Sequence, residues 1–149
     1  MEGIDREDTL KLYDKILMGT RIAVNSLECI ARKSASLQLS GEIRRTIGKY
    51  EEIDRKAARA ILTLGGKPRR ISKAMRLRDW WTVSVKAFFN NSPAEMARIV
   101  LKGFDMGEDQ LQGCENAYPN ASESARQLVQ ELFQMQDEQK SIYKRYLNA

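Results

Sequence analysis

The stretch ILTLGGKP, residues 61–68, decides the fold, because one long helix ends in it and the connection to the second half of the chain begins there. A glycine pair after a run of apolar residues is a common C-terminal stop for a helix, and a proline two residues later prevents the helix from continuing. The next strong signal is SPAE, residues 92–95, where serine caps a helix, proline takes its first position and glutamate its third. Residues 67–90 therefore form a long connection between two helical halves.

Four segments outside this connection repeat apolar residues at alternating steps of three and four, which is typical of helices with one buried face. The expected helices are residues 8–33, 37–64, 93–118 and 121–147. At 1.5 Å per residue, a helix of about 26 residues is ~39 Å long. A serine-rich turn near residues 34–36 and the pair Pro119-Asn120 separate the helices within each half, and Asn120 is the expected cap of the last helix.

The lengths of the turns predict how the helices are arranged. Two short turns give two antiparallel hairpins, whereas the connection of residues 67–90 is long enough to run the length of a bundle. We expect this crossover to be partly helical, over about residues 72–89, and to make the third helix parallel to the second. The chain is then one all-α four-helix-bundle domain, residues 1–149.

These motifs resemble the ferritin-like superfamily and, within it, a group of uncharacterised bacterial four-helix-bundle proteins. The resemblance is carried by Leu64-Gly65-Gly66-Lys67-Pro68, by the aromatic-rich connection, and by Gly107-Glu108-Asp109 in the third helix. It spans nearly the whole chain. It implies a ferritin-like fold with a long crossover, and it assigns no settled activity.

The composition excludes several kinds of chemistry. The sequence contains no histidine, which excludes Ser/His and Cys/His catalysis and every zinc site with a histidine ligand. Cys29 and Cys114 are isolated thiols, and we expect them to be small buried side chains, whereas a redox role would need an accessible thiol with a perturbed pKa. No apolar run approaches the ~18 residues that span a bilayer, and the acidic start MEGIDREDTL is unlike a signal peptide. We therefore expect a cytoplasmic protein.

Four acids are the candidate metal ligands. If the second and third helices are parallel, these acids lie within about one helical turn of one height. They are Glu51, Asp54, Glu108 and Glu131. Ferritin-like carboxylate proteins place Glu and Glu-x-x-His ligands on such helices, and the resemblance is degenerate because both histidine positions are lost. Oxygen ligands favour Mn²⁺, Mg²⁺ or Ca²⁺ over zinc, and a Mn or Fe ion is the cofactor this arrangement would take.

The same acids have a simpler interpretation as structural residues. Three or four carboxylates around one point repel each other unless cations or protons neutralise them. Arg21 lies near the same height and could pair with Glu51 or Glu131, while Glu108 could bond across helices or reach solvent. On this interpretation no metal is bound.

Two glycines lie beside Glu108 in the third helix. Gly103 and Gly107 are four residues apart and share one stripe, and each costs about 1 kcal/mol relative to alanine in a helix interior. We expect them to allow close approach of a neighbouring helix or of an aromatic ring such as Trp80 or Trp81. The alternative is a gap that admits a ligand.

The connection carries a basic segment, KPRRISKAMRLRDWW, residues 67–81, with six basic residues and one acidic residue. The basic side chains are Lys67, Arg69, Arg70, Lys73, Arg76 and Arg78. Together with the aromatic residues they could bind an anionic membrane surface or a nucleic acid. We favour the alternative that an apolar stripe of the segment covers the bundle while its cations face water. Aromatic residues beside cations also make a homodimer plausible.

The sequence thus predicts a ferritin-like bundle of unassigned biochemical activity. The interpretation we favour is a non-catalytic, cytoplasmic structural or interaction protein without a cofactor, and analogy alone implies a role under stress. One alternative is a carboxylate-based metal-binding or weak oxidoreductase bundle. The other is binding to a membrane surface or a nucleic acid through residues 67–81.

Overall fold

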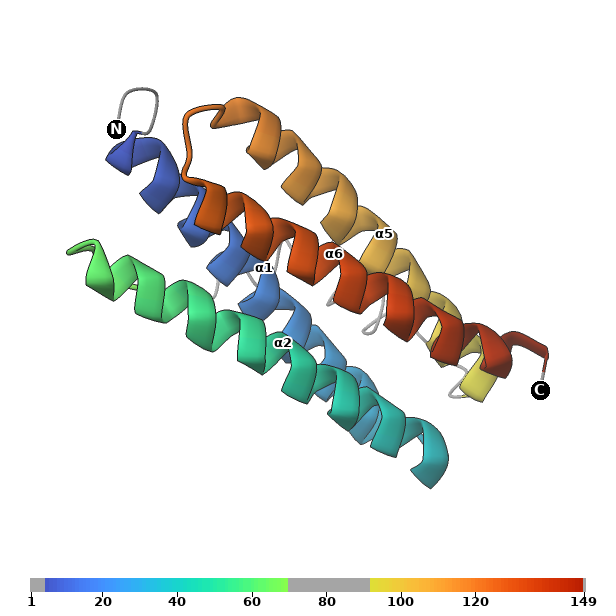
Figure 1. The fold of residues 1–149 in the computed structure, drawn as a ribbon. Coiled ribbons are helices and arrows are strands. Elements are labelled where there is room, and N and C mark those ends of the chain that lie inside the picture. Colours follow the sequence, from blue (N-terminus) through green and yellow to red (C-terminus); the bar gives the residue numbers. More distant parts are fainter. Residues whose placement is uncertain (1–4, 70–91, 149) are drawn as a thin grey trace.

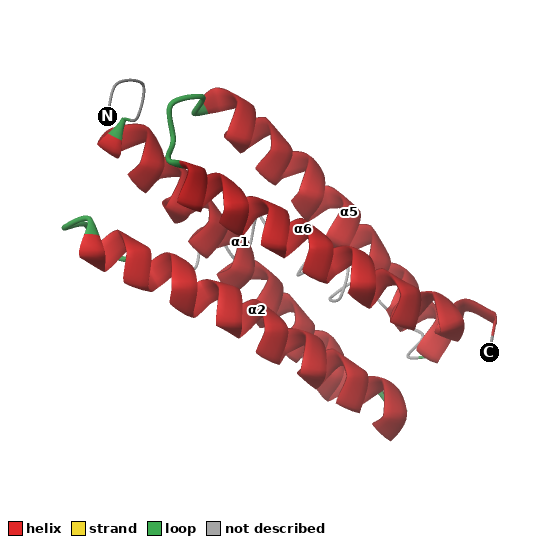
Figure 2. Ribbon diagram, viewed as in Figure 1, coloured by secondary structure: helices red, strands yellow, loops and turns green. Residues whose placement is uncertain are grey.

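The structure is a computed structural model that describes residues 5–69 and 92–148. Within these residues the chain forms the all-α four-helix bundle that the sequence predicts (Figure 1). The helices are α1 (Arg6–Lys33), α2 (Leu37–Thr63), α5 (Pro93–Ala117) and α6 (Glu123–Lys144), and the short 3₁₀ helix η1 (Arg145–Asn148) follows α6. Figure 2 shows that, within the described residues, the segments that flank and connect these helices are short loops. The helix expected over residues 72–89 lies outside the described residues.

Each helix begins at a polar residue whose side chain accepts a hydrogen bond from the first turn. Ser92 accepts one from the amide three residues later, at 3.3 Å, and Pro93 follows it at the start of α5, as the SPAE motif predicts. α6 begins two residues later than expected, because Ser122 and not Asn120 is its cap. Caps of this kind contribute about 1 kcal/mol each.

The starts and ends of the helices fix the topology. The amide of Asp5 donates to the carbonyl oxygen of Asn120 at 2.8 Å, which joins the start of α1 to the turn after α5. The guanidinium of Arg6 binds the carbonyl oxygen of Leu64, which joins the start of α1 to the end of α2. α2 and α5 therefore end at the same end of the bundle and run parallel (Figure 1). This is the arrangement with one long crossover.

The first residues of the crossover turn back along α1. Gly65 has a φ of 83°, a left-handed conformation that glycine adopts without strain, and it ends α2. A Cβ on Gly66 would lie 3.1 Å from Leu10, and Arg69 forms an ion pair with Asp14. The chain after α2 thus runs along α1 away from its start, which is the direction that a crossover to α5 requires.

The core runs between all four helices. Its fully buried side chains include Leu12 and Ile16 of α1, Tyr50 of α2, Phe104 of α5 and Tyr143 of α6. Removing a large apolar side chain from water contributes roughly 1.5–3 kcal/mol. Apolar burial therefore sets which face of each helix points inward, and it positions the polar residues that lie beside the core.

The outer surface is mainly polar. Among the described side chains, the large hydrophobic ones with high exposure are Leu37 and Leu62, which are 90% and 60% exposed, and both lie on α2. No helix in residues 5–69 or 92–148 combines the length and the apolar character that a membrane crossing needs.

Candidate functional site

The structure does not bring the four predicted acids together. Three of them form separate ion pairs, each with a cation from a neighbouring helix. The pairs are Asp54 with Arg21 of α1, Glu131 with Lys56 of α2, and Glu108 with Lys140 of α6. Glu51 is exposed on α2. Within the two described ranges, there is no group of three or more Asp, Glu, Cys or His side chains placed to hold a metal ion.

Arg21 is paired differently from our expectation. Its Nε lies 3.1 Å from Oδ2 of Asp54, and the pair is partly buried between α1 and α2. The expected partners were Glu51 and Glu131. The same guanidinium binds the carbonyl oxygen of Arg69, so Arg21 joins α1, α2 and the start of the crossover.

Glu108 is neutralised by Lys140. Oε2 of Glu108 accepts a hydrogen bond from Nζ of Lys140 at 3.1 Å, and the same ammonium lies 2.9 Å from Asp105 and 3.6 Å from Asp137. Burial raises the pKa of Glu108, Lys140 opposes this rise, and Asp137 and Asp105 add to it. Oε1 of Glu108 is buried and has no hydrogen-bond partner among the described residues. The acid in the third helix is therefore held mainly through one of its two oxygens.

The pKa of Lys140 is raised by two of these carboxylates, Asp105 and Glu108. Burial lowers the pKa of Lys140, but its hydrogen bonds to Asp105 and Glu108 outweigh that effect, and the pKa is raised overall. Lys140 therefore stays protonated at neutral pH and serves as a fixed cation between α5 and α6.

A cluster of buried polar side chains joins α2 to α6, and we call it the polar cluster. Its members are Thr46, Tyr50, Gln136, Gln139 and Tyr143. The hydroxyl of Thr46 donates to Oε1 of Gln139 at 2.9 Å and lies 2.6 Å from the hydroxyl of Tyr143. Oε1 of Gln139 and the carbonyl oxygen of Glu42 are both acceptors, so the single hydroxyl proton of Thr46 is directed toward them and Tyr143 donates to Thr46.

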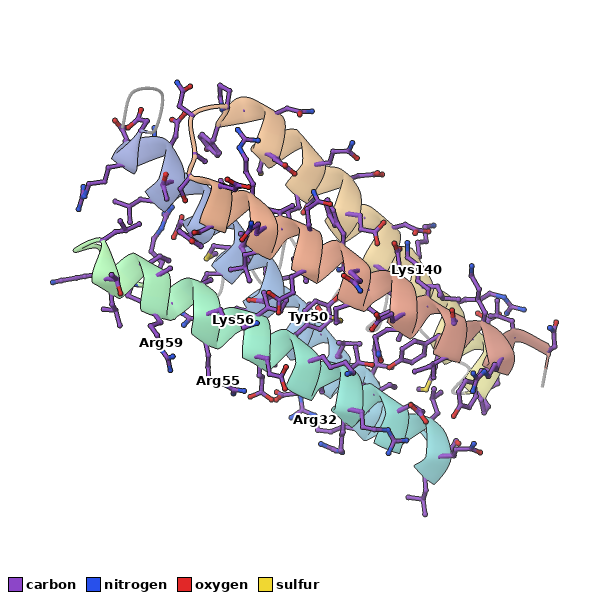
Figure 3. All side chains as sticks on the ribbon, viewed as in Figure 1. Arg32, Tyr50, Arg55, Lys56, Arg59 and Lys140 are labelled. Carbon is purple, nitrogen blue, oxygen red and sulfur yellow. The ribbon has the colours of Figure 1, made fainter. Side chains whose placement is uncertain are left out.

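The second half of the polar cluster is one turn away. Nε2 of Gln136 donates to the hydroxyl of Tyr50 at 2.8 Å, while Oε1 of Gln136 is buried without a partner in the described part of the chain. Figure 3 shows Tyr50 in the middle of the bundle. Each such bond contributes about 0.5–1.5 kcal/mol, and leaving its partner unpaired costs more. The polar cluster therefore fixes the register of α2 against α6.

Phe104 of α5 packs beside the polar cluster. Its ring centroid lies 6.3 Å from that of Tyr50 and 5.8 Å from that of Tyr143, in tilted and edge-on geometries that aromatic pairs favour. A Cβ on Gly107 would lie 3.7 Å from Nε2 of Gln136, which is an ordinary contact distance. The close approach that we expected is therefore not found at Gly107, although its neighbour there does belong to another helix.

The two tyrosines of the polar cluster have pKa values raised further above neutral pH. Burial raises the pKa of Tyr50 and of Tyr143, and the hydrogen bonds that Tyr50 shares with Gln136 and Tyr143 shares with Thr46 only partly oppose this rise. Both phenols are therefore neutral at physiological pH and act as hydrogen-bonding groups. The polar cluster therefore serves to position α2 against α6. Among the described residues, two buried oxygens, Oε1 of Glu108 and Oε1 of Gln136, are left as acceptors for a further donor or cation.

The remaining sequence candidates that the structure describes are half-buried or exposed. Cys29 and Cys114 are half-buried free thiols, and the guanidinium of Arg32 lies 3.5 Å from the sulfur of Cys29. Lys67 and Arg69 are exposed, and Arg69 pairs with Asp14. The other predicted basic-surface residues lie outside the described residues: Arg70, Lys73, Arg76 and Arg78.

Sequence reasoning missed Gln136, Lys140 and Tyr143. A signal for them was present, because α6 carries polar residues at positions 136, 139, 140 and 143, spaced as one helix face. Thr46 and Tyr50 are likewise one turn apart on α2. Glutamine and tyrosine suit both buried and exposed positions, so the spacing alone did not reveal that these residues pair.

Comparisons with known proteins identify no relative. No family model matches the chain, and neither a curated protein nor a solved structure matches it.

Proposed function

We propose that this chain is a non-catalytic, ferritin-like helical bundle that acts in the cytoplasm by binding another macromolecule. The observation that supports this most is the polar cluster. Its side chains bond to one another across α2 and α6, and burial raises the pKa of both of its tyrosines away from the range useful for proton transfer. This part of the interior is thus built to hold α2 and α6 in register.

The surface supports a binding role. The first described hairpin, residues 5–69, has 14 basic and 9 acidic residues, whereas residues 92–148 have 6 basic and 9 acidic residues. A charge division of this kind orients and attracts charged partners. Self-association as a homodimer belongs to the same proposal, because the two halves are of opposite sign.

A measurement of metal content and of mass tests this proposal. The chain is purified without chelator, incubated with Mn²⁺ or with Fe²⁺ under anaerobic conditions, desalted and analysed for bound metal. We expect less than about a tenth of an equivalent of metal per chain. A metal site that contributes to folding would be close to fully occupied. Light scattering after gel filtration should give twice the chain mass of 17.1 kDa. Stoichiometric metal together with peroxide or oxygen turnover would overturn the non-catalytic assignment.

A carboxylate metal site is the second candidate, and one observation favours it. Oε1 of Glu108 and Oε1 of Gln136 are buried acceptors without partners among the described residues, and oxygen atoms are the ligands that Mn²⁺ and Mg²⁺ prefer. Lys140 opposes it, since its ammonium already lies against Oε2 of Glu108. The variant Glu108→Gln separates the two candidates, because only a metal-binding protein loses metal on this change.

A further inference from the structure

The C-terminal half of α2 differs from the rest of the surface in its charge. From residue 55 to residue 78 the sequence has nine lysines and arginines and no acid. The described part of this run belongs to the hairpin that carries the excess of positive charge. Figure 3 shows Arg55 and Arg59 along the outer side of α2, away from α5 and α6, whereas Lys56 pairs with Glu131 of α6.

Three of these cations have no partner within the described residues. Lys56 is paired with Glu131 and Arg69 with Asp14. Arg55, Arg59 and Lys67 are exposed, and within residues 5–69 and 92–148 none of the three forms an ion pair or a side-chain hydrogen bond. Arg55 and Arg59 lie on α2, and we call these two the α2 basic surface, while Lys67 lies beyond the end of the helix, in the first residues of the crossover.

The α2 basic surface contains a pair of like charges that its own helix does not compensate. Arg55 and Arg59 are one turn apart, and like charges at this spacing repel and destabilise a helix. Glu51 and Glu52 precede Arg55 by one turn and mark the boundary of the surface, but Arg59 has no acid three or four residues away on either side. An anionic partner would remove this repulsion.

The neighbouring residues favour a phosphate backbone over a bilayer. Between residues 44 and 59, every exposed position of α2 is charged or glycine, and beyond them Leu62 is the one large hydrophobic side chain exposed in the second half of α2, so this surface has no continuous apolar face that could enter a lipid layer. A helix that lies in a membrane interface needs an apolar face, and the apolar face of α2 is buried in the core. Arginine, in turn, binds phosphate through two parallel hydrogen bonds.

We propose that the α2 basic surface, Arg55 and Arg59, binds the phosphate backbone of a nucleic acid without sequence preference. This proposal rests on the proposed binding function and names its partner. Side chains one helical turn apart are about 5–6 Å apart at their Cβ atoms, and a duplex carries one charge per ~1.7 Å of its axis. Neighbouring cations of α2 can therefore reach separate phosphates.

Fluorescence anisotropy with labelled duplex DNA and labelled single-stranded RNA tests the proposal on the full chain over a series of salt concentrations. We expect binding whose logarithm falls linearly with the logarithm of salt, and a shallower slope, by about 2 for duplex DNA, in the double variant Arg55→Ala/Arg59→Ala. The matched control is Lys144→Ala/Arg145→Ala, which removes the same charge from exposed residues at the end of α6. It should keep at least half of the wild-type affinity.

Three outcomes would overturn the proposal: no binding to either nucleic acid, equal loss in the two double variants, or binding only to anionic phosphatidylserine vesicles. Circular dichroism of both variants should show unchanged helix content, because all four residues are exposed. If nucleic acid fails to bind while the protein stays metal-free and dimeric, this partner is wrong and the non-catalytic bundle stands.

Discussion

Nζ of Lys140 on α6 lies 3.1 Å from Oε2 of Glu108 on α5. This pair explains how α5 tolerates Glu108, a partly buried acid, on the side that faces α6. The ammonium supplies the opposite charge that a metal would otherwise supply, and it is shared with Asp105 and Asp137. Removing Lys140 and removing Glu108 have different costs. Lys140 has other carboxylates beside it, whereas among the described residues Lys140 is the one cation paired with Glu108.

Lys140→Met should destabilise the protein more than Glu108→Leu. The first change leaves a partly buried carboxylate without its cation, which costs about 1–3 kcal/mol. The second leaves Lys140 paired with Asp105 and removes a buried oxygen that has no partner, so we expect a change within about 1 kcal/mol. Urea unfolding gives both values. The double variant should recover part of the loss, and a larger cost for Glu108→Leu would contradict this assignment.

The stability of the protein should depend on pH through Glu108. Burial raises the pKa of Glu108 above its usual value of 4.5. A carboxyl that holds its proton more tightly in the folded state favours folding below its unfolded pKa, and this contribution is lost as pH rises through the folded pKa. The wild type should therefore lose stability relative to Glu108→Gln as pH rises from about 4 through the raised pKa. Urea midpoints of both proteins check this, and a difference that does not vary with pH would refute it.

Tyr143→Phe should cost about 0.5–1.5 kcal/mol, because Thr46 then loses the donor that lies 2.6 Å from its hydroxyl. Tyr146→Phe is the matched control. Tyr146 is partly exposed one turn later, and its hydroxyl has no hydrogen bond within the described residues, so the change should stay within about 0.5 kcal/mol. Thermal unfolding measures both. Equal effects of the two substitutions would mean that the polar cluster does not fix the α2–α6 register.

Two glycines should respond to alanine in opposite ways. Gly107 lies inside α5 and has room for a methyl group, so Gly107→Ala should stabilise the protein by up to about 1 kcal/mol. Gly65 has a φ of 83°, so Gly65→Ala should destabilise it by about 1 kcal/mol or more. Urea unfolding compares them directly. A loss of stability for Gly107→Ala would show that α5 needs a smaller residue there than the contact distance indicates.

The fold was predictable because its signals are local. Ser92-Pro93 starts α5 and Gly65 ends α2 by backbone chemistry that acts within one turn, and the length of the crossover then determines that α2 and α5 are parallel. Ser122 replaced Asn120 as the cap of α6 because both residue types can cap a helix, and only tertiary packing decides between them.

The site was harder to predict because height along a bundle does not determine direction. Each residue turns a helix by about 100°, since 3.6 residues complete a turn. Tyr50 is fully buried while Glu51, the next residue, is exposed, although both lie near the same height. The predicted convergence of acids assumed a common direction as well as a common height. The pairing of Glu108 with Lys140 depends on the rotation of α5 against α6, which the sequence pattern defines only to within a residue or two.

Cations of the chain itself neutralise the acids that pair across helices: Asp54, Glu108 and Glu131. Thermal unfolding of the full chain with and without saturating Mn²⁺ or anaerobic Fe²⁺ tests this most directly, because a ligand that binds only the folded state raises the unfolding temperature. We predict the same midpoint with and without metal for the wild type and for Glu108→Gln. A rise in midpoint for the wild type that disappears in Glu108→Gln would contradict the claim.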